Sequence, residues 1–336
     1  MTAIERLAAV TRHLLPAARP RAVVLVYHRV GERHLDPWRL MVDPEIFGGQ
    51  MQALARDWSP LSLAELVEGL ARRRLPERAV AVTFDDGYAD NLEIAAPILA
   101  EHGIPATLFI ATGLVDADGP PWWDQLASLL LEPARLPSTL TLSSGGDPWR
   151  IPPLAADERH PPSNTPPPWN AEPGTRLRTF YEVWLALRAL DAPTREAALD
   201  EIAEWAGAPR SSGRVLLTWE QVRQFAALPG LALGAHTLTH PALPSCSCQD
   251  ARAEIAGGAD RLRAQTGVEV DQFAYPFGAW TASVARLVAD LGFRAAYTTA
   301  GNATSWSSSP HALPRVPAEN HARGDFCSML AGVSGR

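Results

Sequence analysis

The sequence predicts an α/β fold built from parallel βαβ units, and three observations support this prediction. The chain of 336 residues is long enough for one enlarged α/β barrel. Hydrophobic residues make up 46% of it and charged residues 20%, which is ample apolar material for a core. Short apolar runs also alternate with patterns of helical length, as parallel strands joined by crossover helices do.

The apolar runs are rich in valine, isoleucine and aromatic residues, which is typical of buried strands. They cover residues 22–27, 79–84, 106–111, 231–235, 272–275 and 294–298. Helical patterns lie between them at residues 44–56, 63–73, 91–102, 249–265 and 282–291. Gly103 and Gly292 directly follow two of these patterns, where glycine favours the end of a helix.

The alternation stops between residues 116 and 213, which we interpret as an insertion in the barrel rather than an independent domain. Residues 133–173 hold 11 of the 30 prolines, so we expect an irregular loop over residues 136–171. Residues 176–207 predict two short helices, and the next helix should begin near Thr218. Residues 21–336 would then form the barrel with its insertion, preceded by an N-terminal helical segment over residues 1–20.

Composition excludes several classes of function. The net charge of −7 argues against a nucleic-acid partner. All 30 basic residues are arginine, which excludes a P-loop lysine, a Schiff-base lysine and a lysine general base. Cys246, Cys248 and Cys327 are too few for a disulfide framework or a four-cysteine zinc site, and an odd number suits a reducing compartment.

The amino terminus does not resemble a signal peptide, because charged residues interrupt its apolar stretch. No segment approaches the ~20 apolar residues of a membrane span. We therefore expect a cytoplasmic protein without an integral membrane segment. An amphipathic helix near the start leaves peripheral membrane contact open, and the sequence does not indicate the oligomeric state.

Two adjacent acids, Asp85 and Asp86, follow the predicted strand 79–84 and precede Gly87. Because side chains alternate along a strand, neighbouring acids at its end point to different sides. One carboxylate is then placed to bind a metal ion while the other faces a substrate. The alternative is a structural role, in which an aspartate caps the next helix and Gly87 forms the turn.

A pair of histidines, His236 and His240, follows the predicted strand 231–235. Residues four apart share one face of a helical turn, so two imidazoles at this spacing can converge on one ion. An isolated histidine pair is more often made of ordinary surface or capping residues. A carboxylate and two histidines at the carboxyl ends of parallel strands favour a metal site, since barrel enzymes place their sites at that end.

Two further strand ends carry candidate catalytic groups. The turn from Tyr275 to Gly278 is placed to present a backbone N–H to a reacting carbonyl as an oxyanion donor, or is only a tight turn. His28 closes the first strand and faces the same end of the barrel, where it is placed to protonate a leaving amine. Its alternative role is that of a core histidine bonded to a backbone carbonyl.

Together these residues resemble the polysaccharide deacetylase family, the carbohydrate esterases of family 4 related to NodB. Thr-Phe-Asp-Asp-Gly at 83–87 matches the first motif of that family, and His-Thr-Leu-Thr-His at 236–240 matches its H-[ST]-x-x-H motif. The resemblance covers roughly residues 20–115 and 214–320. It implies a distorted, incomplete (β/α)7 barrel, which here carries a large proline-rich insertion.

The resemblance also implies one divalent ion, most often Zn²⁺, with Co²⁺ and Ni²⁺ as alternatives. Carried over residue by residue, Asp86, His236 and His240 are the metal ligands and Asp85 is the base. In the mechanism that this implies, Asp85 deprotonates a water molecule that attacks the acetamide, and the Tyr275 backbone N–H shares the developing oxyanion charge with the ion.

The sequence departs from the common family pattern at its third motif, where Ala274 holds the place of an arginine, and in lacking the usual carboxy-terminal Leu-x-His segment. In both respects the sequence resembles the branch of biofilm poly-N-acetylglucosamine deacetylases, whose acid histidine belongs to an early Tyr-His motif. This implies His28 as the general acid, with His311 and His321 as competing candidates. We further hypothesise that Arg315 replaces the lost arginine and reaches Asp85.

Aromatic residues are the candidates for sugar contact. Trp122 and Trp123, followed by Asp124, are candidates to stack on sugar rings, with Phe277 as a further substrate-binding residue, although an anchoring role for the tryptophans is slightly favoured. The alternative is that the tryptophans anchor the insertion to the barrel, since tryptophan is mostly buried. Cys246 and Cys248 are expected in a loop, because the Asp-His-His ligand set is complete without them.

The function that the resemblance implies is removal of an N-acetyl group from an amino sugar in a polysaccharide, glycolipid precursor or glycoconjugate. The same residues leave an O-acetyl esterase or a deformylase on a related sugar open. A catalytically silent carbohydrate-binding module is the alternative from another class. A cytoplasmic location would suit a sugar nucleotide, a lipid-linked precursor or a glycosylated product handled before export.

Overall fold

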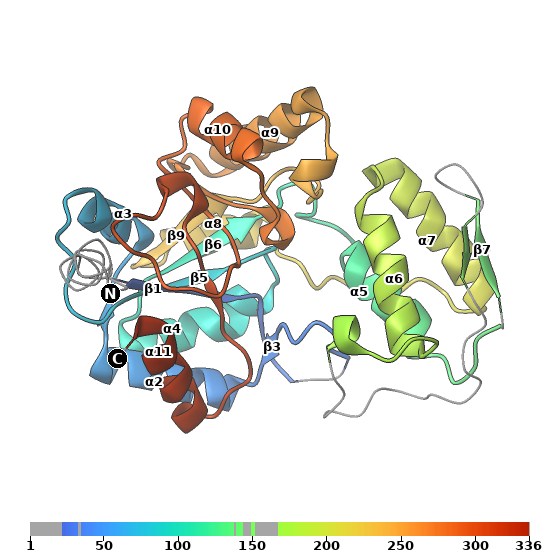
Figure 1. Cartoon of the computed structure of the whole chain (residues 1–336), viewed down its shortest axis with the longest axis horizontal. Coiled ribbons are helices and arrows are strands. Elements are labelled where there is room, and N and C mark those ends of the chain that lie inside the picture. Colours follow the sequence, from blue (N-terminus) through green and yellow to red (C-terminus); the bar gives the residue numbers. More distant parts are fainter. Residues whose placement is uncertain (1–21, 33–34, 138, 144–148, 152–166, 336) are drawn as a thin grey trace, which may run out of the picture.

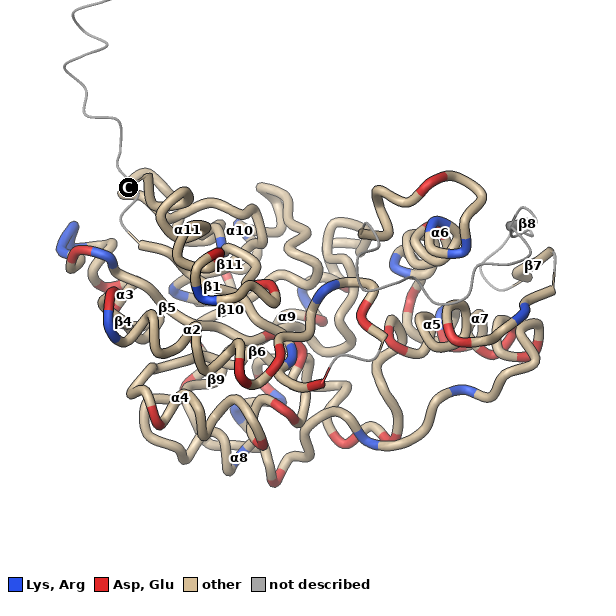
Figure 2. Tube along the Cα trace, turned by 90° about the horizontal axis from the view of Figure 1, so that it is seen from below, with Lys and Arg blue, Asp and Glu red and all other residues tan. Residues whose placement is uncertain are grey.

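The structure, a computed structural model, describes residues 22–32, 35–137, 139–143, 149–151 and 167–335 (Figure 1). The expected N-terminal helical segment, residues 1–20, lies outside this range. The described chain forms a barrel of parallel strands with surrounding helices, and a smaller helical lobe beside it (Figure 1). Acidic and basic residues are interspersed over both parts (Figure 2).

The barrel is built on a sheet in which every paired strand is parallel to its neighbour. Its strands, in spatial order, are β11 (Ala295–Tyr297), β10 (Gln272–Ala274), β9 (Leu231–Ala235), β6 (Ala106–Ile110), β5 (Ala79–Phe84), β1 (Ala22–Tyr27) and β12 (Val316–Pro317), with β4 (Ser59–Pro60) paired to β5 off this path. The six predicted strands are all present. The two-residue strands β4 and β12 are too short to give a sequence pattern.

One short segment near the carboxyl end is bound to both edges of this sheet. Leu313 forms a parallel bridge with Tyr297 of β11, and three residues later β12 pairs with β1. The sheet is therefore curled into a distorted, incomplete barrel, as the sequence predicted. Strands β1, β5 and β6 are buried along their whole length, because the sheet is covered on both faces.

Helices cover the outside of the barrel (Figure 1). They are α2 (Pro44–Asp57), α3 (Leu63–Ala71), the π-helical turn η1 (Asn91–Ala95), α4 (Ala96–His102), α8 (Trp219–Ala227), α9 (Cys248–Thr266), α10 (Ala282–Asp290) and α11 (Arg323–Ser334). Local sequence fixes their ends: Thr218 and Gln221 form a capping box at the start of α8, and Gly103 ends α4 in the left-handed region. Helix α11 was not expected.

Shorter elements complete the barrel part. Strands β2 (Arg29–Val30) and β3 (Met41–Val42) form a parallel pair, and single helical turns lie at η3 (Leu243–Ser245), η4 (Pro276–Gly278) and η5 (Pro310–Ala312). None of the helices in the described ranges combines the length and apolar character needed to span a bilayer.

The insertion forms the helical lobe. It contains α5 (Trp122–Leu131), the antiparallel strands β7 (Leu140–Leu142) and β8 (Trp149–Ile151), the turn η2 (Pro168–Asn170), α6 (Arg176–Arg188) and α7 (Ala192–Ala206). The two helices expected over residues 176–207 are present. Helix α5 was missed, and the stretch expected to be wholly irregular includes the β7–β8 pair.

The lobe has an apolar cluster of its own, separate from the two clusters of the barrel. Leu126, Phe180 and Ile202, one from each lobe helix, are fully buried in it. Trp38, Leu114 and Phe277, which belong to barrel loops, pack against the edge of this cluster. The lobe is therefore held to the barrel by apolar contacts at the carboxyl ends of the strands.

Candidate active site

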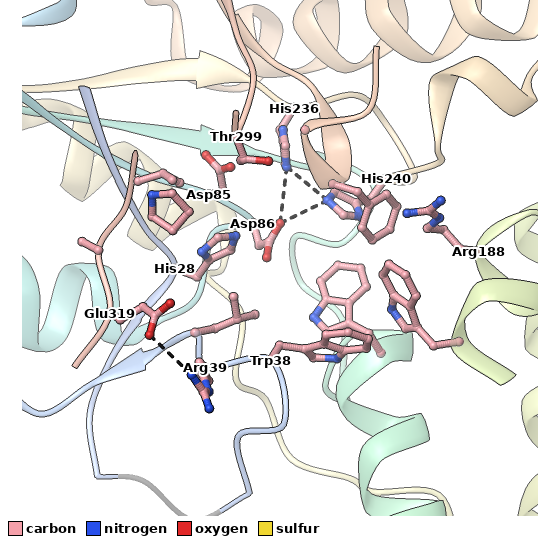
Figure 3. Close-up of a pocket in the computed structure, with 18 of the residues that line it drawn as sticks. His28, Trp38, Arg39, Asp85, Asp86, Arg188, His236, His240, Thr299 and Glu319 are labelled. Atoms are coloured by element: carbon pink, nitrogen blue, oxygen red, sulfur yellow. Dashed lines mark hydrogen bonds and ion pairs between the residues drawn. The ribbon is translucent and has the colours of Figure 1, made fainter. Parts of the chain in front are cut away.

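The site lies at the carboxyl ends of β5 and β9, where two turns bring three polar side chains together. Asp86 follows β5, while His236 and His240 follow β9. One potential ligand atom from each lies within 4.8 Å of the others, and all three residues are buried. Figure 3 shows the two histidines converging on Asp86.

The backbone around this cluster takes conformations that side-chain-bearing residues seldom adopt. Asp86, Thr237, His240 and Phe277 all have positive φ, from 58° to 74°. Residues held in this region cost free energy and gather at functional sites, where the surrounding structure enforces them. The site is therefore built from turns whose geometry is imposed by the fold.

The distances within the cluster fit a divalent ion. His236 Nε2 and His240 Nε2 are 3.1 Å apart, and they lie 3.4 Å and 3.3 Å from Oδ1 of Asp86. Ligand atoms around tetrahedral zinc, with bonds of ~2.0–2.1 Å, are about 3.3–3.4 Å apart. Asp86 Oδ1 is buried and receives no hydrogen bond from the described residues, so a cation between these atoms would satisfy it.

The two imidazoles are oriented by different means. Nδ1 of His236 lies 2.8 Å from the Ala274 carbonyl oxygen, and a proton donated there leaves Nε2 free to bind a metal. His240 is instead enclosed by the Trp123 and Phe277 rings, with centroids at 4.6 Å and 4.5 Å. Burial lowers the pKa of His240 to about 4, so this imidazole is neutral at physiological pH.

A glutamate that the sequence did not single out fixes the histidine turn. Glu254 of α9 accepts hydrogen bonds from the backbone N–H groups of Leu238 and Thr239 at 3.0 Å and 2.8 Å, and from the Thr239 hydroxyl at 2.7 Å. These bonds hold the loop between His236 and His240. No local pattern marks Glu254, because its partners are 15 and 16 residues away.

Asp85 points to the other side of the strand end, where Arg315 holds it. The guanidinium donates to both carboxylate oxygens at 2.7 Å, and Arg315 itself is fully buried. Arg315 also donates to the Thr83 hydroxyl and the Thr298 carbonyl oxygen. Burial is the largest single influence on the pKa of Asp85 and would raise it, but the charge and hydrogen bonds of Arg315 together with the charge of His236 outweigh burial and lower that pKa. The contact hypothesised between Arg315 and Asp85 is present.

Of the three histidines considered as the acid, His28 is the one beside the cluster. It lines the same pocket as Asp85 and Asp86, at the end of β1 (Figure 3). His311 Nε2 lies 2.8 Å from the Phe293 carbonyl oxygen. The backbone carbonyl of His321 accepts a bond from Gln50. Neither His311 nor His321 lines the pocket.

The expectation for Tyr275 was wrong. Its backbone N–H donates to the Tyr297 carbonyl oxygen at 3.1 Å, as part of the β10–β11 edge, and is not available to an oxyanion. Its hydroxyl donates to the His311 carbonyl oxygen at 2.8 Å. The turn itself still reaches the pocket through Phe277 and Gly278, and a Cβ on Gly278 would overlap Thr299.

The two adjacent tryptophans have different surroundings. Trp122 is buried in the lobe cluster and does not line the pocket, so it has the anchoring role that was favoured and not the sugar contact. Trp123 lines the pocket but is only 3% exposed, because it packs on His240 and donates through Nε1 to the Tyr88 hydroxyl. Phe277 lines the pocket as expected.

A pocket of about 430 Å³ opens over the cluster. The barrel side carries Asp85, Asp86 and the three histidines His28, His236 and His240. The opposite side carries residues that the sequence did not single out: Trp38, Trp169, Tyr181, Trp184 and Arg188. They come from a barrel loop and from η2 and α6 of the lobe, so only the folded chain assembles them.

Comparison with known proteins identifies the family of this chain. The sequence profile of the family described as polysaccharide deacetylase matches residues 72–136 and 186–296, more than half of the chain. YxkH of Bacillus subtilis strain 168, a protein whose name describes it as a polysaccharide deacetylase, is 33% identical to this chain over 97 residues. That match covers 28% of this chain and 32% of YxkH, so the chain spans about a third of the curated relative it matches.

Solved deacetylase structures share the fold. The deacetylase PplD of Streptococcus pyogenes in complex with acetate has a TM-score of 0.59 at 18% identity, covering 93% of this chain and 99% of that one. IcaB from Ammonifex degensii has a TM-score of 0.56 at 18% identity, covering 94% and 97%. BC0361, a polysaccharide deacetylase from Bacillus cereus, has a TM-score of 0.58 at 16% identity, covering 93% and 69%.

Proposed function

The chain belongs to the polysaccharide deacetylase family, and from this premise we propose that it is a metal-dependent hydrolase that removes an N-acetyl group from an amino sugar and releases acetate. The observation that supports this most strongly is the separation of two roles at one strand end. Asp86 joins the histidines in a set suited to a metal ion, whereas Asp85 is held apart by Arg315. One carboxylate suited to bind a metal ion and a second one kept ionised apart from it fit a metal-assisted hydrolysis with a separate general base.

Asp86, His236 and His240 would hold one divalent ion, with Zn²⁺ the first candidate and Co²⁺ or Ni²⁺ the alternatives. Three protein ligands leave a position open for water or substrate, as catalytic zinc sites do. When bound, the ion would lower the pKa of a water molecule and polarise the acetyl carbonyl. Burial of all three ligands keeps competing water from them.

Asp85 would act as the general base. Arg315 holds both of its oxygens and keeps it ionised, so that it is ready to accept a proton at neutral pH. His28 would act as the acid that protonates the amine as acetate leaves, because it lines the pocket beside both aspartates. With these two assignments we propose that the chain belongs to the branch that has an early Tyr-His motif.

Phe277 would contact the sugar from the turn after β10, since it is half-buried and faces the pocket. Trp123 would act on the reaction through His240, whose ring it packs against. We also propose a cytoplasmic location and a biosynthetic substrate. The three free cysteines suit the reducing environment of this location.

The experiment that tests the function compares the products released from matched sugars. Protein reconstituted with zinc is given N-acetyl, O-acetyl and N-formyl derivatives of glucosamine, and acetate, formate and free amine are measured. We expect acetate and free amine in equal amounts from the N-acetyl sugar. Acetate without amine would identify an esterase, formate a deformylase, and no product a carbohydrate-binding module.

A further inference from the structure

The lobe supplies one wall of the pocket, and this wall is aromatic. We use the term lobe wall for Trp38, Trp169, Tyr181, Trp184 and Arg188, where Trp38 is the one contribution from a barrel loop. Its rings pack on one another: the ring centroids of Trp38 and Trp184 are 4.5 Å apart, and Tyr181 stacks on Trp184 with ring centroids 6.1 Å apart. Aromatic faces of this kind suit the apolar faces of sugar rings.

Much of the lobe wall lies outside the part of the chain that matches the family profile. The profile matches nothing between residues 136 and 186, the stretch that holds Trp169, Tyr181 and Trp184, and it begins after Trp38. The metal cluster, in contrast, lies inside the matched ranges. The aromatic residues of the lobe wall therefore belong to stretches that the family profile does not match, whereas Arg188 lies inside the matched range 186–296.

Arg188 is the charged residue of the lobe wall. It is the last residue of α6, and its guanidinium lies 4.8 Å from the Trp184 ring and 5.4 Å from the Phe277 ring. Figure 3 shows it extending from the lobe toward His240. Burial lowers the pKa of Arg188, which means that the guanidinium has lost part of its water.

The other charged side chains that line the pocket have partners. Asp85 is paired with Arg315, Glu319 lies 3.8 Å from Arg39, and Asp86 belongs to the metal cluster. Within the described ranges, Arg188 has no carboxylate partner and no hydrogen bond; its neighbours are the aromatic rings. A half-buried guanidinium without a counter-charge is costly unless a ligand supplies one.

The position of Arg188 relates it to the proposed reaction centre. Phe277 contacts both: its ring centroid is 4.5 Å from that of His240 and 5.4 Å from the Arg188 guanidinium carbon. Arg188 and a proposed metal ligand therefore contact the same aromatic ring. A sugar whose acetamide is at the cluster would bring a neighbouring substituent within reach of the guanidinium.

From this arrangement we infer that Arg188 binds an anionic group, a carboxylate or a phosphate, carried by the N-acetylated sugar, and that the enzyme prefers acidic sugars to neutral ones. The inference rests on the proposed function, because it names the substrate class of the same site. Guanidinium groups bind both anions through two parallel hydrogen bonds, so the two sources share one recognition chemistry. The Trp38 indole N–H, buried without a partner among the described residues, is a second donor on the same wall.

The test compares acetate release from N-acetylglucosamine, N-acetylmuramic acid and N-acetylglucosamine 1-phosphate. The second sugar differs from the first by a carboxylate-bearing ether, and the third by a phosphate. We expect kcat/KM for one or both acidic sugars to exceed that for the neutral sugar by roughly 10- to 100-fold, the range of a hydrogen bond to a charged group. The acidic sugar with the higher kcat/KM identifies whether the site binds a carboxylate or a phosphate.

Three variants locate the effect. Arg188→Gln should remove most of the preference, through a KM that rises more for the acidic sugars than for the neutral one. Arg188→Lys keeps the charge but not the paired donors, and should retain part of the preference. Arg286→Gln makes the same change on an exposed arginine of α10 outside the pocket, and should change nothing.

Equal kcat/KM for acidic and neutral sugars would overturn the inference and leave the proposed function standing. So would an equal loss on all sugars in Arg188→Gln and Arg188→Lys, which would show that Arg188 only packs on the lobe wall. If no sugar releases acetate, the proposed function fails. Calorimetric titration of the metal-free protein with the two acidic sugars then tests the inference about Arg188 by itself. Binding that is lost in Arg188→Gln supports the inference, and no binding overturns it.

Discussion

The two sides of the pocket differ in both chemistry and construction. The barrel side is polar and tightly paired: Arg315 holds Asp85, and Asp86 faces two histidines. The lobe side is aromatic, and its one charged residue, Arg188, lies among rings. A site arranged in this way separates the reaction, which needs fixed charges, from substrate choice, which needs shape and one unpaired charge. Substitutions on the barrel side should therefore lower stability or turnover, whereas substitutions on the lobe side should change substrate binding.

The largest effect is expected from breaking the buried ion pair of the barrel side. Arg315→Met should lower the free energy of unfolding by about 3–5 kcal/mol, because it leaves the Asp85 carboxylate buried without a counter-charge. Urea denaturation of the wild type and of Arg315→Met measures this difference in the free energy of unfolding. Arg286→Met, on the exposed face of α10, should stay within about 0.5 kcal/mol of the wild type. A loss below about 1 kcal/mol for Arg315→Met would show that the pair is hydrated in solution.

Asp85→Asn separates the base from the metal ligands. The amide cannot take the proton, so acetate release should fall by about 10²–10⁴-fold while the bound metal per chain is unchanged. Metal analysis and an acetate assay on the same preparation measure both quantities. Asp118→Asn, on a side chain that is 99% exposed, serves as the control. Turnover retained in Asp85→Asn would remove this residue as the base.

A smaller effect is expected where the two sides join, at Asp124 in the first turn of α5. Its carboxylate accepts a bond from the Tyr88 hydroxyl and lies 4.0 Å from Arg29. Burial raises the pKa of Asp124 to about 6, against an ordinary value of 3.8. The folded state thus holds this proton more tightly than the unfolded state does. The stability that it contributes is present below about pH 4 and is lost as the pH rises through 6.

The measurement for Asp124 compares the wild type with Asp124→Asn at several pH values. As the pH rises from 4 to 7, the free energy of unfolding of the wild type should fall by up to about 3 kcal/mol relative to that of Asp124→Asn. Carbon NMR of the carboxylate gives the pKa directly. A pH-independent difference, with a pKa near 4, would contradict the assigned environment.

The smallest effect is expected at the rim of the lobe wall. Trp169 is 46% exposed, so Trp169→Ala should leave the free energy of unfolding within about 0.5 kcal/mol. Loss of one stacking surface should raise KM by about 2–10-fold with kcat unchanged. Trp280→Ala is the matched control, since Trp280 is 43% exposed but does not line the pocket. An equal KM in both variants would remove Trp169 from the substrate site.

The same contrast explains how much the sequence could predict. The strands, the aspartate pair and the histidine pair could be identified because each belongs to one strand end, where neighbouring residues define the geometry. Arg315 required the resemblance to a family, since its partner is 230 residues away. Tyr275 was misassigned because a sequence does not show that its backbone N–H is used at the sheet edge.

The lobe wall could not be predicted, for a physical reason. Trp38, Trp169 and Trp184 meet through tertiary packing across the insertion, and no periodicity relates them. Glu254 was missed on the same ground, as its bonds to the histidine turn cross from a helix to a loop. Trp122 and Trp123 were treated as one unit, although the start of α5 directs one into the lobe and the other toward His240.

The central claim is that Asp86, His236 and His240 form one metal site, and the most direct test is the metal content of the purified protein. We predict about one ion per chain after reconstitution with zinc, cobalt or nickel, lost in Asp86→Ala and in His240→Ala and kept in Asp118→Asn. The absence of a specific ion in the wild type, or its retention in both ligand variants, would contradict the claim.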